Sequence, residues 1–181
     1  WQAVLAIDSM DMVATNNLSL ALQERGDTVA GVDYARRALT ARDSSVVGYT
    51  NLLMAFLNAG MVDSAAALRT QIEARFPGNQ RVTPSAVFVA YAQGNYTDAE
   101  RLTRSLQDPA LPVELRTFGY GGVQALAGVQ GRLREATENA RKASELSISQ
   151  GLGGGSYSAL TDLAVQDAVY RNDPVRGKRF M

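Results

Sequence analysis

Glycine and proline residues divide the chain into segments in which apolar positions recur with the period of an α-helix. Runs of strictly alternating β-branched residues, which are typical of strands, do not occur in the sequence. Four segments share one arrangement, in which a glycine is followed by a few polar residues and then by a helical pattern with small residues at fixed offsets. These segments are ERGDTVAGVDYARRALTARD, NAGMVDSAAALRTQIEARFP, AQGNYTDAERLTRSLQDPAL and VQGRLREATENARKASELSI. The pattern predicts an all-α protein with an internal repeat.

The glycines that open these segments are evenly spaced. Successive separations are 34, 34 and 37 residues, for Gly26, Gly60, Gly94 and Gly131. A glycine is well suited to a helix that ends in the left-handed backbone region. Five residues after each glycine the chain always has Gly or Ala, at Gly31, Ala65, Ala99 and Ala136. Two antiparallel helices pack closely only where side chains are small, and a larger side chain there is expected to cost about 1–3 kcal/mol through overpacking.

Other offsets from the glycines always carry apolar residues, several of them larger. Twelve positions after each glycine stand Ala38, Ile72, Leu106 and Ala143, and eight positions before it stand Leu18, Leu52, Ala86 and Val123. Nine positions after it the pattern is weaker, with Ala35, Arg69, Thr103 and Ala140, so we expect looser packing there. The three extra residues before Gly131 fall at DPALPVEL, where two prolines predict a longer loop between repeats.

A period of 34 residues with these small positions resembles the tetratricopeptide repeat (TPR) family over nearly the whole chain. The resemblance implies an α-α superhelix, a TPR-like solenoid of antiparallel helix pairs. It places repeats at about 12–45, 46–79, 80–113 and 117–150. Residues 1–11 match the end of a preceding repeat, and residues 151–181 match a glycine loop followed by a truncated fifth repeat. We therefore expect a fragment of a longer protein, with atypical terminal caps as the alternative.

The glycine-dense stretch QGLGGGSY, at 150–157, raises the question of a phosphate-binding loop. A Walker loop needs a closing Gly-Lys-Ser/Thr and no lysine follows, while Ser156 stands where a dinucleotide-binding loop has its third glycine. We interpret the stretch as a hinge between repeats, with Ser156 as the cap of the next helix.

Composition narrows the possible functions. Eighteen basic residues balance eighteen acidic ones, which disfavours nucleic acid and membrane surfaces as partners. The chain has no cysteine and no histidine, which excludes serine or cysteine triads of the usual kind and the commonest metal ligands. Its acids are scattered along polar helix faces. We therefore expect a protein that is not an enzyme and that uses no cofactor and no metal. No apolar run approaches the roughly 20 residues that a bilayer span needs, so we expect a soluble, cytoplasmic protein.

The TPR resemblance also implies a concave wall formed by the first helix of each repeat. Inward positions on the family pattern hold asparagines, which can bond an extended peptide backbone as donor and acceptor, together with apolar residues of the types enriched at interfaces. Arg81 is the only cation among them, so a clamp for two carboxylates is not expected. The alternatives are core packing for the apolar residues and solvated surface for the asparagines. The candidate peptide-binding residues are Asn16, Leu20, Asn51, Met54, Arg81, Phe88, Tyr91 and Phe118.

From this resemblance the leading hypothesis is a non-catalytic protein–protein interaction scaffold that presents a groove to a peptide or helix. The alternative is the regulatory or sensory TPR region of a larger bacterial signalling protein, a kinase or transcription regulator, because LAIDS and VQGRLREA resemble such regions. A third possibility, an enzyme built on helix pairs, predicts a deep pocket with converging acids.

Overall fold

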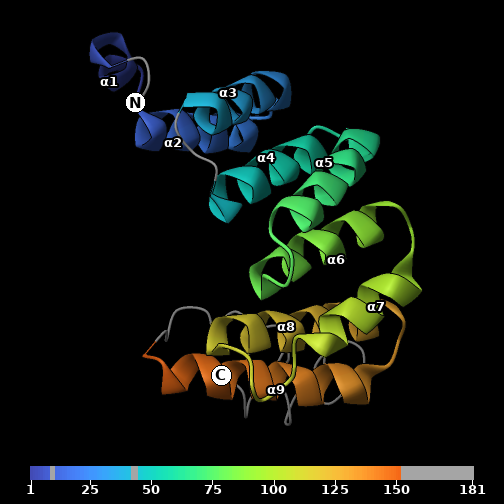
Figure 1. Cartoon of the computed structure of the whole chain (residues 1–181). Coiled ribbons are helices and arrows are strands. Elements are labelled where there is room, and N and C mark those ends of the chain that lie inside the picture. Colours follow the sequence, from blue (N-terminus) through green and yellow to red (C-terminus); the bar gives the residue numbers. More distant parts are fainter. Residues whose placement is uncertain (9–10, 42–44, 152–181) are drawn as a thin grey trace. The chain divides into compact units, whose positions relative to one another are not determined.

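A computed structural model of the chain describes residues 1–8, 11–41 and 45–151, and every regular element in these residues is helical (Figure 1). The all-α prediction is therefore confirmed. The expected fifth repeat, the hinge after Gly151 and the Ser156 cap lie outside the described residues. The α-helices are α1 (Gln2–Ile7), α2 (Met12–Glu24), α3 (Thr28–Ala41), α4 (Val46–Asn58), α5 (Val62–Arg75), α6 (Thr83–Ala92), α7 (Tyr96–Ser105), α8 (Val113–Val129) and α9 (Leu133–Ser149), with a 3₁₀ helix at Gln80–Val82.

The chain forms two compact units, Trp1–Asn95 and Tyr96–Met181. In the first unit each α-helix packs on the next α-helix along the chain, from α1 to α6. Helix α4 also contacts both α2 and α6. In the second unit α8 packs against both α7, which precedes it in the chain, and α9, which follows it. The boundary between the units falls inside the expected repeat at 80–113, between α6 and α7.

The turn glycines adopt the backbone that the sequence predicted. Gly26, Gly60, Gly94 and Gly131 have φ values of 85°, 71°, 73° and 72°. In each turn the residue after the glycine donates its N–H to the carbonyl four residues before the glycine, for example Met61 to Phe56 at 2.8 Å and Asn95 to Ala90 at 2.9 Å. This bond satisfies a carbonyl at the helix end that has no partner within the helix, which is why a left-handed glycine recurs there.

The small positions five residues after the glycines are all buried. Ala65, Ala99 and Ala136 have no exposed surface, and a Cβ placed on Gly31 would lie 2.6 Å from Cγ of Gln23. The positions twelve residues after the glycines are buried as well. The core of the first unit gathers around them, where Leu53, Phe56, Ile72 and Val89 pack together.

The weaker position nine residues after the glycine packs better than expected in the second unit. Thr103 is fully buried, and its hydroxyl donates to the Ala99 carbonyl at 2.6 Å. Helix α8 approaches α7 closely because it presents Gly119 and Gly122: a Cβ on Gly122 would lie 2.5 Å from Cγ2 of Thr103. Glycines in α8 thus allow close packing around Thr103, where the sequence predicted looser packing.

The connection before α8 is long, as the two prolines predicted: seven residues, 106–112, separate α7 from α8, whereas four separate α3 from α4, and α8 itself is also extended. Helix α8 begins at Val113, 18 residues before Gly131, whereas α2 and α4 each begin 14 residues before their turn glycine. Pro112 is the N-cap of α8, and its lack of an N–H costs nothing at a helix start.

Candidate peptide-binding surface

Most of the predicted groove residues lie on neighbouring helices of the first unit. Asn16 and Leu20 belong to α2, Asn51 and Met54 to α4, and Phe88 and Tyr91 to α6, and α4 contacts both α2 and α6. Two candidates depart from this row. Arg81 lies in the 3₁₀ helix before α6 instead of on an α-helix, and Phe118 lies on α8, in the second unit. We call the exposed side of α2, α4 and α6 that carries the remaining candidates the inner row.

Three large apolar side chains of the inner row are accessible to a partner. Leu20 is 46%, Phe88 39% and Tyr91 48% exposed. Met54 is partly buried because it packs against the core of the unit. Packing on a neighbouring helix therefore accounts for Met54 better than for the other three.

The predicted asparagines bond to each other. Nδ2 of Asn51 donates to Oδ1 of Asn16 at 2.7 Å, which joins α4 to α2 across 35 positions of the chain. Both residues are partly buried and line a small cleft of about 190 Å³ at one end of the two helices. The cleft is lined by Val13, Asn16, Asn17, Ala35, Ala38, Val47, Gly48 and Asn51.

A second amide pair repeats this arrangement two helical turns further along. Nδ2 of Asn58 donates to Oε1 of Gln23 at 2.7 Å, again across 35 positions. Gln23 is held in place because its Nε2 donates to Oγ of Ser19 at 3.0 Å, and this hydroxyl donates to the buried Gly31 carbonyl at 2.7 Å. Sequence reasoning named Asn16 and Asn51 as separate candidates and missed both amide pairs. The sequence did contain a signal for this pairing: in both pairs the two amide residues are 35 positions apart, one more than the 34-residue period.

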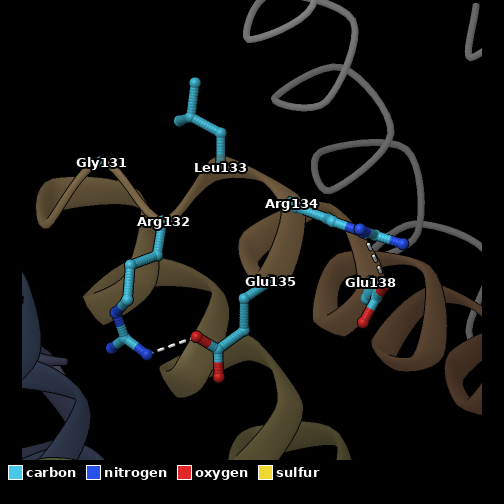
Figure 2. Close-up of a pocket in the computed structure, with 6 residues that line it drawn as sticks. All are labelled: Gly131, Arg132, Leu133, Arg134, Glu135 and Glu138. Atoms are coloured by element: carbon cyan, nitrogen blue, oxygen red, sulfur yellow. Dashed lines mark hydrogen bonds and ion pairs between the residues drawn. The ribbon is translucent and has the colours of Figure 1, made fainter.

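The second unit carries an open depression of about 730 Å³ at the turn between α8 and α9 (Figure 2). Its charged residues are engaged with one another. Arg132 pairs with Glu135, and Arg134 approaches Glu138 at 3.7 Å, while Leu133 points away from the Arg132–Glu135 pair in Figure 2. The depression therefore presents paired charges rather than one sign of charge.

Four of the charges in this unit form a closed ring, which we call the ion ring. Glu100 accepts from Arg104 at 2.6 Å and from Arg132 at 2.8 Å, and Glu135 pairs with the same two arginines. The hydrogen bond from Arg104, together with Arg132 and against a smaller opposing effect of burial, lowers the pKa of Glu100. Bonds to Glu135 and Glu100 raise the pKa of Arg104. A carboxyl whose pKa is lowered is ionised at neutral pH and is poorly suited to donate a proton as a general acid.

Within residues 1–8, 11–41 and 45–151, no three Cys, His, Asp or Glu side chains lie close enough together to hold a metal ion. In the same part of the chain, none of the helices combines the length and the apolar character that crossing a bilayer requires.

Comparison with known proteins identifies the fold. No family model and no curated protein matches the sequence. Among solved structures, PilF of Pseudomonas aeruginosa is similar, with a TM-score of 0.66 and 20% identity over 93% of this chain and 72% of that one. MamA from Desulfovibrio magneticus RS-1, from residue 41 to its end, has a TM-score of 0.58 and 14% identity over 93% and 90% of the two chains. A double mutant of MamA RS-1 gives 0.58 and 14% over 93% and 89%. Both are TPR proteins, so this chain has the TPR fold.

Proposed function

We propose that this TPR-fold chain is a non-catalytic protein-interaction scaffold whose inner row binds a peptide or helix of a protein partner. The observation that carries the proposal is the exposure of Leu20, Phe88 and Tyr91 on neighbouring helices of one unit. Fully burying a large apolar side chain is worth about 1.5–3 kcal/mol, so covering each of these half-exposed side chains supplies on the order of 1 kcal/mol. Aromatic residues are also enriched among the few that dominate binding energy.

The ion ring supports a non-catalytic role for the second unit. The ion ring brings Glu100 and Glu135 together, and both are held between Arg104 and Arg132. Arg81 remains the only cation among the candidates, so the partner needs no pair of carboxylates. A regulatory or sensory region of a larger bacterial signalling protein would use the same surface, and that alternative stays a prediction.

The test uses peptides selected on the purified chain from a library of short random peptides, with affinity measured by fluorescence anisotropy. We expect Leu20→Ala and Tyr91→Ala each to weaken binding about fivefold, which corresponds to about 1 kcal/mol. The matched control is Val29→Ala: this residue is 71% exposed but lies on α3, outside the inner row, and its loss should leave the affinity unchanged. Equal effects of all three substitutions would show that binding takes place elsewhere.

A further inference from the structure

The amide pairs of the inner row form two equivalent polar rungs between α2 and α4. The first rung is Asn16 with Asn51, and the second is Gln23 with Asn58. Each residue of the second rung follows its counterpart in the first by seven positions. Because an α-helix rises 1.5 Å per residue, the rungs lie about 10.5 Å apart along the helices.

In both rungs the same groups make no hydrogen bond with the described residues. In each, the α4 asparagine donates one N–H to the α2 residue, and its own carbonyl oxygen makes no hydrogen bond with the described residues. On the α2 side, Nδ2 of Asn16 makes no such bond, and Nε2 of Gln23 uses one of its two N–H groups on Ser19. Each rung therefore offers a donor from α2 beside an acceptor from α4, which complements the C=O and N–H of a peptide residue.

Between the rungs the surface is apolar. Leu20 stands on α2 and Met54 on α4, each between the two rung residues of its own helix. At the first rung, the 190 Å³ cleft is lined by Val13 and Val47, which are 64% and 59% exposed, and also by the rung residues and Asn17. This volume lies below the roughly 300–1,000 Å³ of pockets for drug-sized ligands, so it suits one side chain. None of these residues carries a charge.

The geometry points to a specific partner chemistry: an uncharged peptide segment in the polyproline II conformation, lying along α2 and α4 with two residues three positions apart on the rungs. A polyproline II chain has three residues per turn and rises 3.1 Å per residue, so equivalent residues recur about every 9.3 Å, close to the rung spacing. A β-strand places equivalent residues about 6.7 or 13.4 Å apart, which fits the rungs less well. This inference rests on the proposed function and adds the conformation and charge of the bound segment.

The experiment scans a selected peptide with single amide-to-ester replacements, each of which removes one backbone N–H without altering a side chain or the protein. We expect two positions, three residues apart, at which the ester weakens binding about tenfold. In Asn51→Ala the ester at one of these positions should cost nothing further, and in Asn58→Ala the same should hold for the other position. Gln71→Ala on α5, which removes an exposed amide outside the inner row, is the matched control and should leave both ester effects intact.

Each outcome bears on the inference. Sensitive positions two or four residues apart, no sensitive positions, or ester effects that persist in both asparagine variants would overturn it. An affinity that falls steeply with added salt would overturn the uncharged contact. If Tyr91→Ala weakens binding while no ester does, the proposed function stands and this inference fails. If the selection yields no binding peptide, both fail.

Discussion

Gly119 in α8 allows the sharpest test of the packing between α7 and α8. A Cβ built on this residue would lie 2.9 Å from the carbonyl carbon of Leu106 and 3.0 Å from the carbonyl oxygen of Thr103. These are backbone atoms of α7 and of the residue that follows it, so they cannot yield by a change of rotamer. Gly119→Ala must therefore push the two helices apart or strain them.

The magnitude follows from a comparison within the same helix. Replacing a helical glycine by alanine gains about 1 kcal/mol in helix propensity. At Gly121 a Cβ would meet nothing within 4 Å, so Gly121→Ala should realise this gain. Gly119→Ala has the same gain and an overpacking cost of about 1–3 kcal/mol. The gain in helix propensity is the same in both variants and cancels when their free energies of unfolding are compared. Gly119→Ala should therefore be less stable than Gly121→Ala by about 1–3 kcal/mol.

Thermal unfolding monitored by far-ultraviolet circular dichroism measures this difference. For a chain of this size 1 kcal/mol shifts the melting temperature by about 2–4 °C, so the two variants should differ by about 2–12 °C. Closely packed helix amides exchange slowly with solvent, so faster hydrogen exchange in α8 of Gly119→Ala would show that the stability is lost in the second unit. If Gly119→Ala is as stable as Gly121→Ala, the conclusion that α7 and α8 approach too closely at Gly119 to admit a Cβ is refuted.

Two further predictions concern the repeat core and the ion ring. Ala65→Leu inserts a large side chain at a fully buried position and should lower the melting temperature by several degrees. Ala67 is exposed on the same helix, so Ala67→Leu should not lower it. An unchanged melting temperature for Ala65→Leu would contradict the helix register. Because the pKa of Glu100 is lowered in the folded state, its contribution to stability is complete at neutral pH and is lost as the pH falls from about 4.3, the ordinary carboxyl value, through the lower folded value. Glu100→Gln should therefore reduce the free energy of unfolding by about 1 kcal/mol at pH 7 and by less at pH 3. The control, Glu138→Gln, removes a charge from an exposed ion pair and should change the free energy of unfolding little at either pH. If Glu100→Gln loses the same stability at both pH values, the role assigned to the ion ring is refuted.

The helix pairing was predictable because it depends on single positions that repeat. Each repeat needs one left-handed residue at its turn and one small residue where two helices meet, and only Gly or Ala satisfies these needs. Gly60 and Ala65 therefore carry the same information as Gly94 and Ala99. The extension of α8 was not predictable in this way, since the period fixes the turn at Gly131 and leaves the start of the helix to local capping at Pro112.

The polar contacts were harder to predict because they join residues whose alignment depends on how two helices are set beside each other. Arg132 lies at the start of α9, and its guanidinium reaches Glu100 on α7 across 32 positions of the chain. The offset between these helices is not contained in either local sequence. The same limit applied to Asn16 and Asn51, whose inward direction was an expectation from the TPR resemblance and whose bond to each other was not expected.

Sequence reasoning offered two alternatives for these asparagines, contact with a ligand or contact with solvent, and the structure shows a third arrangement, a hydrogen bond between the two side chains. A primary amide has two N–H groups and an oxygen with two lone pairs, so one bond between two amides uses only part of their capacity. The bond from Asn51 to Asn16 restricts both side chains before any partner arrives. A partner that uses the remaining donor and acceptor then orders fewer side chains on binding, and immobilising each such side chain otherwise costs about 0.5–1.5 kcal/mol. In the proposed complex the rungs therefore lower the cost of ordering side chains at the positions where they offer hydrogen bonds, which is the reason to look for the partner's backbone there first.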